Sequence, residues 1–121
     1  MWSAIDYMYR DAGNFKAFGT VIVEGPLRAA DQEIIRSRLS SGEFFIAEQV
    51  GVPPLYHELY RWSRGVTSLD HCWHEFIGVR EIGAPEPELV TFKADELVGR
   101  FASVKEWDEE LSAHFSVDIR P

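Results

Sequence analysis

The chain has 121 residues, of which 45% are hydrophobic and 13% aromatic, and its formal net charge is −8. This length predicts one domain over residues 1–121, large enough to bury roughly two-thirds of the surface of the unfolded chain. The composition excludes intrinsic disorder, and the acidic balance disfavours direct binding to nucleic acid, because acidic surfaces repel phosphates.

The start of the chain and its cysteine content indicate the compartment. The first residues lack the basic stretch that begins a secretory signal, and Asp6 follows soon after. No apolar run approaches the ~18 residues that a membrane span needs. Cys72 is the only cysteine, so no internal disulfide can form, which is typical of a reducing compartment. We therefore expect a cytoplasmic protein that does not enter a membrane.

Alternation of apolar and polar residues predicts two strands at the N-terminus, from Trp2 to Tyr9 and from Ala17 to Glu24. Between them, Asp11 to Asn14 has the composition of a tight turn, because glycine and asparagine tolerate a positive φ. Gly25 and Pro26 end the second strand, since proline removes a backbone donor.

Helical spacing of apolar residues then predicts a helix from Leu27 to Leu39, which ends at Ser40 to Gly42. The apolar run from Phe44 to Ala47 is interpreted as a short buried strand. Residues 49–54 form a rigid connector, and residues 64–70 have the composition of a loop. The pattern over residues 55–62 fits a strand and a helix equally well.

The run from Trp73 to Ile82 alternates again and predicts a further strand. Strict alternation places Trp73, Ile77 and Val79 on one face and Phe76 with Ile82 on the other. Residues 83–88 form a turn-rich break, and a short extended segment follows at residues 89–92.

The C-terminal part is expected to contain two helices. Leu97, Val98 and Phe101 share one face of the first, and the run from Ser103 to Glu106 matches a capping box that would begin the second. The inner stripe of this second helix would consist of Val104, Trp107, Leu111 and Phe115. The predicted fold class is therefore α+β: an antiparallel sheet with one inserted helix and a C-terminal helical pair.

Three of the four histidines lie near the single cysteine, and with two acids they form a candidate metal or catalytic cluster. The residues are His57, Glu58, His71, Cys72, His74 and Glu75. Imidazole, thiolate and carboxylate groups bind zinc, but no known zinc-binding spacing is present. The alternative is that the histidines form surface hydrogen bonds and the cysteine fills a small space in the core.

The predicted hairpin turn carries a polar cluster of Arg10, Asp11, Asn14 and Lys16. These side chains either form hydrogen bonds with the backbone of the turn, or they form a recognition site at the tip of the hairpin. In the second case the basic side chains would donate hydrogen bonds to an anion. A later run contains Tyr56, Tyr60 and Trp62, and such aromatic residues are enriched at protein interfaces. Partly buried packing is the alternative for the aromatic run.

Three stretches resemble a group of short bacterial proteins of unassigned function. They are Tyr9 to Lys16, Phe44 to Pro53, and Asp70 together with Trp73-His74-Glu75. The resemblance covers most of residues 7–77. It implies no activity, because none is assigned to the group.

No complete catalytic motif is present, which favours a binding role over an enzyme. We expect a small acidic binding or regulatory module of an accessory or toxin-neutralising type, which engages a protein partner of basic character and has no cofactor. The expected binding residues are Arg10, Asp11, Asn14, Lys16, Tyr56, Tyr60, Trp62, Trp73, His74 and Glu75. The alternative is a metal-binding protein or small enzyme that uses His57, His71, His74 and Glu75.

Overall fold

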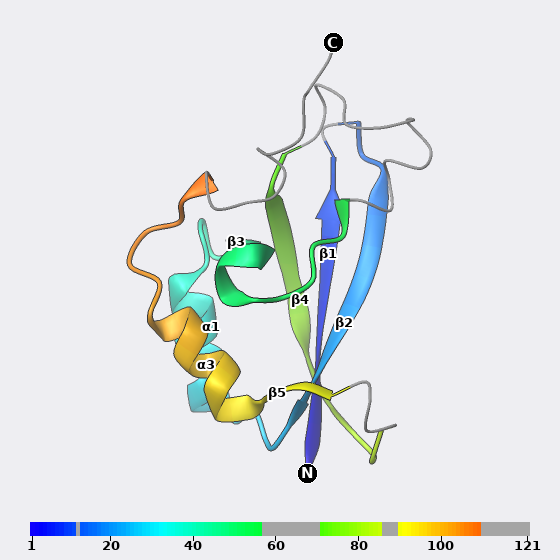
Figure 1. Cartoon of the computed structure of the whole chain (residues 1–121), viewed down its shortest axis with the longest axis vertical. Helices are drawn as coiled ribbons and strands as arrows, with labels where there is room; N and C mark the ends of the chain where they lie inside the picture. Colours follow the sequence, from blue (N-terminus) through cyan, green and yellow to red (C-terminus); the bar gives the residue numbers. More distant parts are fainter. Residues whose placement is uncertain (12, 57–70, 86–89, 110–121) are drawn as a thin grey trace.

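The computed structural model describes residues 1–11, 13–56, 71–85 and 90–109. Figure 1 shows a curled five-stranded sheet with two helices at one side, in the strand order β3-β4-β1-β2-β5. The predicted α+β class is confirmed. The strands are β1 (Trp2–Arg10), β2 (Lys16–Glu24), β3 (Phe44–Ile46), β4 (Trp73–Ile82) and β5 (Val90–Lys93). The helices are α1 (Ala29–Arg38) and α3 (Ala94–Ala102), with a 3-10 turn, η1 (Ala47–Val50).

The two N-terminal strands form the predicted hairpin, and β1 lies at the centre of the sheet. β1 and β2 are antiparallel from Trp2, opposite Glu24, to Arg10, opposite Lys16. On its other side β1 pairs with β4, also antiparallel. The turn contains Asn14 with a φ of 67°, as its composition predicts.

The sheet is mixed, so the prediction of a purely antiparallel sheet is only partly confirmed. β5 pairs in parallel with β2 at Ile22, Val23 and Glu24. Both β4 and β2 are antiparallel to β1 and therefore run in one direction, and β5 follows that direction too. The alternation of apolar residues carries no information about strand direction, which is why the sequence could not indicate this pairing.

A β-bulge in β4 overturns the predicted assignment of its two faces. Tyr7 lies opposite Phe76 and Asp6 lies opposite Gly78, which leaves Ile77 as an additional residue. Phe76 is buried and Val79 packs against the core, both on the inner face, whereas Ile77 is 51% exposed. Strict alternation would place Phe76 and Val79 on opposite faces. The extra residue at the bulge shifts the alternation by one, so both side chains lie on the inner face.

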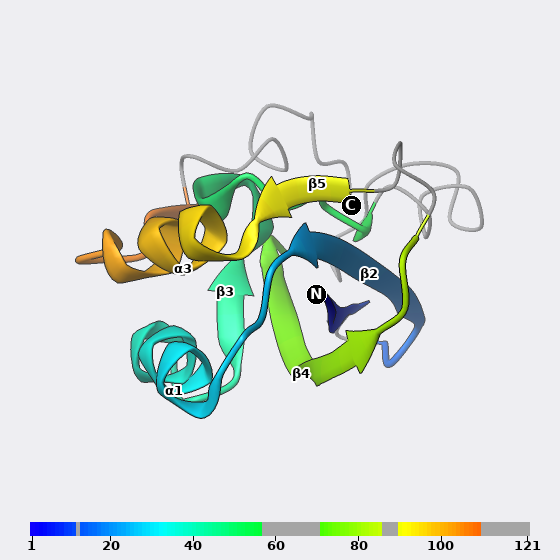
Figure 2. The same ribbon diagram turned by 90° about the horizontal axis from the view of Figure 1, so that it is seen from below.

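The inner face of the sheet, which carries Ile5, Tyr7 and Tyr9, forms one wall of the hydrophobic core. Figure 2 shows the two helices next to each other beside β3, outside the curl formed by the other strands. They contribute Ile35, Leu97, Val98 and Phe101 to the core, and Leu39 joins it directly after α1. The segment after η1 covers the inner face, where the Tyr7 hydroxyl donates to the carbonyl of Pro53 at 2.7 Å. A Cβ at Gly19 would lie 2.8 Å from Cδ2 of Leu55, so any other residue there would require the Leu55 side chain to shift.

The second C-terminal helix does not begin where the capping box predicts. Ser103 ends α3 instead, because its hydroxyl donates to the carbonyl of Gly99 at 2.8 Å. Residues 104–108 are not helical, and Trp107 donates its indole N–H to the carbonyl of Arg38 at 2.8 Å. The remainder of the predicted helix, with Leu111 and Phe115, lies outside the described residues. The described helices are too short and too polar to cross a membrane.

Candidate functional site

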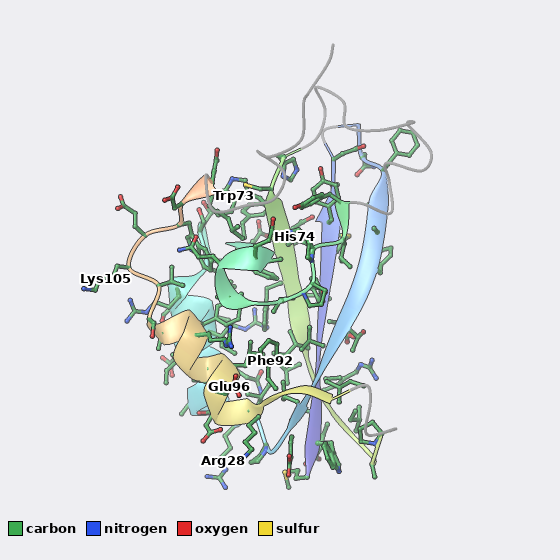
Figure 3. All side chains as sticks on the ribbon, viewed as in Figure 1. Arg28, Trp73, His74, Phe92, Glu96 and Lys105 are labelled. Atoms are coloured by element: carbon green, nitrogen blue, oxygen red, sulfur yellow. The ribbon has the colours of Figure 1, made fainter. Side chains whose placement is uncertain are left out.

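The start of β4 divides the predicted site residues between the two faces of the sheet. His74 lies opposite Tyr9 on one side and Phe45 on the other, so its side chain belongs to the inner face. Its neighbours Trp73 and Glu75 point to the outer face, because successive residues of a strand alternate. Figure 3 labels Trp73 and His74 at this end of β4.

His74 is fully buried and makes two hydrogen bonds to the backbone. Its Nε2 accepts from the N–H of Leu55 at 2.9 Å, and its Nδ1 lies 3.2 Å from the carbonyl oxygen of Cys72. An amide N–H only donates and a carbonyl only accepts, so the imidazole is neutral with its proton on Nδ1. The rings packed around it belong to Tyr7, Tyr9, Phe45 and Tyr56.

Burial in this aromatic environment lowers the pKa of His74 from its usual 6.5 to about 4, although the bond to Cys72 favours the charged form. The residue is therefore uncharged at neutral pH. Its two bonds join Leu55 to Cys72, which are distant in sequence. The geometry gives His74 a role in holding two chain segments together.

His71 also has both ring nitrogens engaged with the backbone. Nε2 lies 2.7 Å from the carbonyl oxygen of Arg10, and Nδ1 accepts from the N–H of Trp73 at 3.0 Å. A metal ion at His71 or His74 would have to displace these bonds. Within the described residues no group of three or more histidine, cysteine or acidic side chains is arranged around a common point. His57 and Glu58 lie outside the described residues.

On the outer face, a hollow of about 410 Å³ lies beside Trp73. It is lined by Ser40, Phe44, His71 and Trp73, and its lining is mainly apolar. The indole Nε1 of Trp73 donates to Oε1 of Glu109 at 2.9 Å. Trp107 packs edge-on against the same indole, with 6.3 Å between the ring centroids. The segment after α3 thereby fixes the orientation of Trp73.

Charged side chains lie next to this hollow. Glu75 is directly opposite Phe44 in the sheet and forms an ion pair with Arg10 at 3.3 Å. Lys16 lies opposite Arg10 in the hairpin. The structure thus brings four predicted binding residues, Arg10, Lys16, Trp73 and Glu75, to one outer face.

The other predicted binding residues are placed differently. The Asp11 carboxylate accepts a hydrogen bond from the N–H of Phe15 at 3.0 Å, so its side chain stabilises the hairpin turn. Asn14 is the residue of that turn with a positive φ. Tyr56 is fully buried and donates its hydroxyl to Glu48 at 2.6 Å, in agreement with the packing alternative. Tyr60 and Trp62 lie outside the described residues.

Residue type and local pattern offer no reason to select Ser40, Phe44 or Glu109 for this site. Phe44 reaches Trp73 only because β3 pairs with β4, and that pairing joins segments about thirty residues apart in the chain. Glu109 approaches Trp73 only because the chain does not continue as a helix directly after α3. The contribution of these residues depends on tertiary structure alone.

Comparison of the chain with protein-family models, with curated proteins and with solved structures gave no match. The resemblance to the group of short bacterial proteins therefore stays a prediction, and the function has to be argued from the site.

Proposed function

We propose that this protein is a small binding module that engages a basic protein partner through its outer face. The contact surface would be the hollow lined by Ser40, Phe44, His71 and Trp73, together with Glu75 and Glu109; we call it the Trp73 surface. The observation that supports the proposal is the combination of an apolar hollow beside an indole ring with two carboxylates next to it, of which Glu109 is bonded to the indole and Glu75 is paired with Arg10.

This chemistry suits the side chain of an arginine or a lysine. The apolar stem of such a side chain packs against Phe44 and Trp73, and its charge interacts with the aromatic faces and with the carboxylates. A cation placed over an aromatic ring contributes about 0.5–1 kcal/mol at an exposed site and roughly 2 kcal/mol when water is excluded. The bond from Trp73 to Glu109 places negative charge on the edge of the indole and thereby strengthens the attraction.

The charge of the whole chain favours the same class of partner. A net charge of −8 on 121 residues attracts basic surfaces and accelerates their encounter with the module. The attraction acts over about 8 Å at physiological salt, so it steers the approach and adds to the contacts of the hollow. An accessory or toxin-neutralising role in the cytoplasm would suit such a module.

The proposal is tested by affinity capture from a lysate of the source cells, at low and at high salt, with identification by mass spectrometry. Wild-type protein is compared with Trp73→Ala and with Phe18→Ala, an exposed aromatic residue on the outer face that does not line the hollow.

We expect a basic protein that wild type and Phe18→Ala retain, that is weakened at high salt, and that Trp73→Ala retains poorly. Equal retention of that protein by Trp73→Ala would contradict the proposal. A captured partner that is acidic and insensitive to salt would contradict it as well.

A further inference from the structure

β4 is much longer than the strand that pairs with its outer edge. β3 covers only Trp73 to Glu75, and the next contact on that side is the N–H of Phe76, which donates to the carbonyl of Glu43 at 2.8 Å. From Ile77 to Ile82, no described segment pairs with this edge of β4. Alternate residues of the stretch therefore direct their backbone N–H and C=O groups away from the sheet.

The same stretch forms one wall of a second hollow, of about 400 Å³. Val79, Arg80 and Glu81 lie on the side of the sheet, and the opposite wall is the chain that leads into α1. That wall consists of Pro26, Leu27, Arg28 and Gln32, and the remaining lining residues are Met1 and Ser3. A sheet edge facing the start of a helix across a groove is the geometry in which an extended peptide adds to a sheet.

The length and the side chains of the groove restrict what can occupy it. Six residues of β4 span about 20 Å, which corresponds to a strand of five or six residues. Val79 is half-buried on the inner face and offers an apolar contact. Arg28 is exposed and makes no ion pair within the described part of the chain, whereas Arg80 is already bonded to Asp6 at 2.8 Å. Glu81 also lines the groove and makes no ion pair within the described part of the chain, so an occupant has to place a carboxylate beside Arg28 and keep further acids away from Glu81.

The edge is also protected against pairing with a second copy of this chain. The bulge at Ile77 interrupts the ladder, and Arg80 and Glu81 place charges on the strand, two features that oppose association between identical edges. Complementary charges on a partner strand remove the second obstacle, and the bulge lies at the start of the stretch, so Gly78 to Ile82 still form a regular edge.

We propose that the edge of β4 from Ile77 to Ile82 is a second binding site, which takes an extended segment of a partner protein with an acidic side chain facing Arg28. The segment adds to the sheet through backbone hydrogen bonds. It places an apolar, β-branched side chain against Val79 and a carboxylate against the guanidinium of Arg28. This site is independent of the Trp73 surface, which lies at the other end of β4.

The test is a selection from a randomised octapeptide library displayed on phage, with the full chain as bait. The enriched peptides are then synthesised and titrated into the ¹⁵N-labelled protein. We expect enrichment of alternating β-branched residues with at least one acid, and shifts of the amide signals of Val79, Arg80 and Glu81. Absence of enriched peptides, or shifts located elsewhere on the sheet, would overturn the proposal.

Two comparisons separate strand addition from mere charge attraction. Methylation of the peptide nitrogens that face β4 should weaken binding about tenfold, because their hydrogen bonds to β4 are lost, and methylation of the alternate nitrogens should leave binding unchanged. Arg28→Glu should weaken binding by a similar factor, while Lys105→Glu, an equal change of charge at a different place on the surface, should leave it unchanged. Equal effects of the two methylation patterns, or of the two charge reversals, would overturn the proposal.

Discussion

Two neighbouring residues, Trp73 and His74, give one strand a buried structural side chain and a side chain that we propose for recognition. The indole of Trp73 lines a hollow on the outer face, where a partner can reach it. The imidazole of His74 is enclosed by four aromatic rings on the inner face and holds Leu55 and Cys72 by hydrogen bonds. The sequence places His74 in a candidate site, but its geometry is that of a buried structural residue.

The low pKa of His74 makes the stability of the folded protein depend on pH. Its pKa is about 4 in the folded protein and about 6.5 in the unfolded chain, so the unfolded chain binds the proton first as the pH falls. The free energy of unfolding is unaffected above pH 6.5 and decreases from there towards pH 4. The loss between pH 8 and pH 5 should be on the order of 2 kcal/mol. Urea denaturation at the two pH values measures it.

His74→Gln is the matched control for this prediction. A glutamine oxygen can still accept from the N–H of Leu55 but does not titrate, so the variant should be less stable at pH 8 and show a smaller loss between pH 8 and pH 5. If wild type and variant lose the same amount, other groups cause the acid sensitivity and the account of His74 is wrong.

Among the elements, those with a strong local signal could be predicted from the sequence, and those defined by long-range contacts could not. The hairpin, α1, β3, β4 and α3 are all present at the predicted places, because alternation, helical spacing and turn residues act locally. The parallel pairing of β5 and the bulge at Ile77 depend on segments distant in sequence. The helix predicted to begin at Ser103 does not begin there, because the Ser103 hydroxyl donates to a carbonyl of the preceding helix α3 instead of capping a new one.

The candidate site follows the same rule. Arg10, Lys16, Trp73 and Glu75 could be selected from residue type alone, and they lie on one face because β1, β2 and β4 are adjacent in the sheet. The division between Trp73 outside and His74 inside could have been inferred from the alternation of a strand. The participation of Phe44 and Glu109 could not, since no local pattern brings those segments together.

Two glycines provide a test at the scale of the elements. Gly51 ends η1 with a φ of 75°, and a Cβ there would lie 2.5 Å from the guanidinium of Arg100. Gly99 lies inside α3 with nothing within 4 Å of a built Cβ. Gly51→Ala should lower the free energy of unfolding by about 1–2 kcal/mol, because alanine is strained in the left-handed region.

Gly99→Ala should instead raise the free energy of unfolding by about 0.5–1 kcal/mol, because glycine is unfavourable inside a helix. Urea denaturation of both variants at neutral pH measures the two changes. The described geometry of η1 is wrong if Gly51→Ala is as stable as wild type, and that of α3 is wrong if Gly99→Ala is less stable.

At the scale of the whole molecule, the long strand β4 carries a different surface at each end. The Trp73 surface lies beside its first residues, and the groove between β4 and the start of α1 lies beside its last ones. The first surface suits a basic side chain, and the second suits an extended segment with a carboxylate placed at Arg28. The net charge of −8 favours the first contact at long range, whereas the second depends on local charge at Arg28 and on backbone hydrogen bonds.

The central claim, that the Trp73 surface binds a basic side chain, is tested most directly by nuclear magnetic resonance. The indole N–H signal of Trp73 is followed while N-acetyl-arginine amide is added, and again with N-acetyl-citrulline amide, which has nearly the same shape without the charge. We predict a saturable shift of the Trp73 signal with the arginine compound, reduced by salt, and little or no shift with citrulline. Equal shifts with both compounds, or an arginine-induced shift at the other tryptophans but not at Trp73, would contradict the claim.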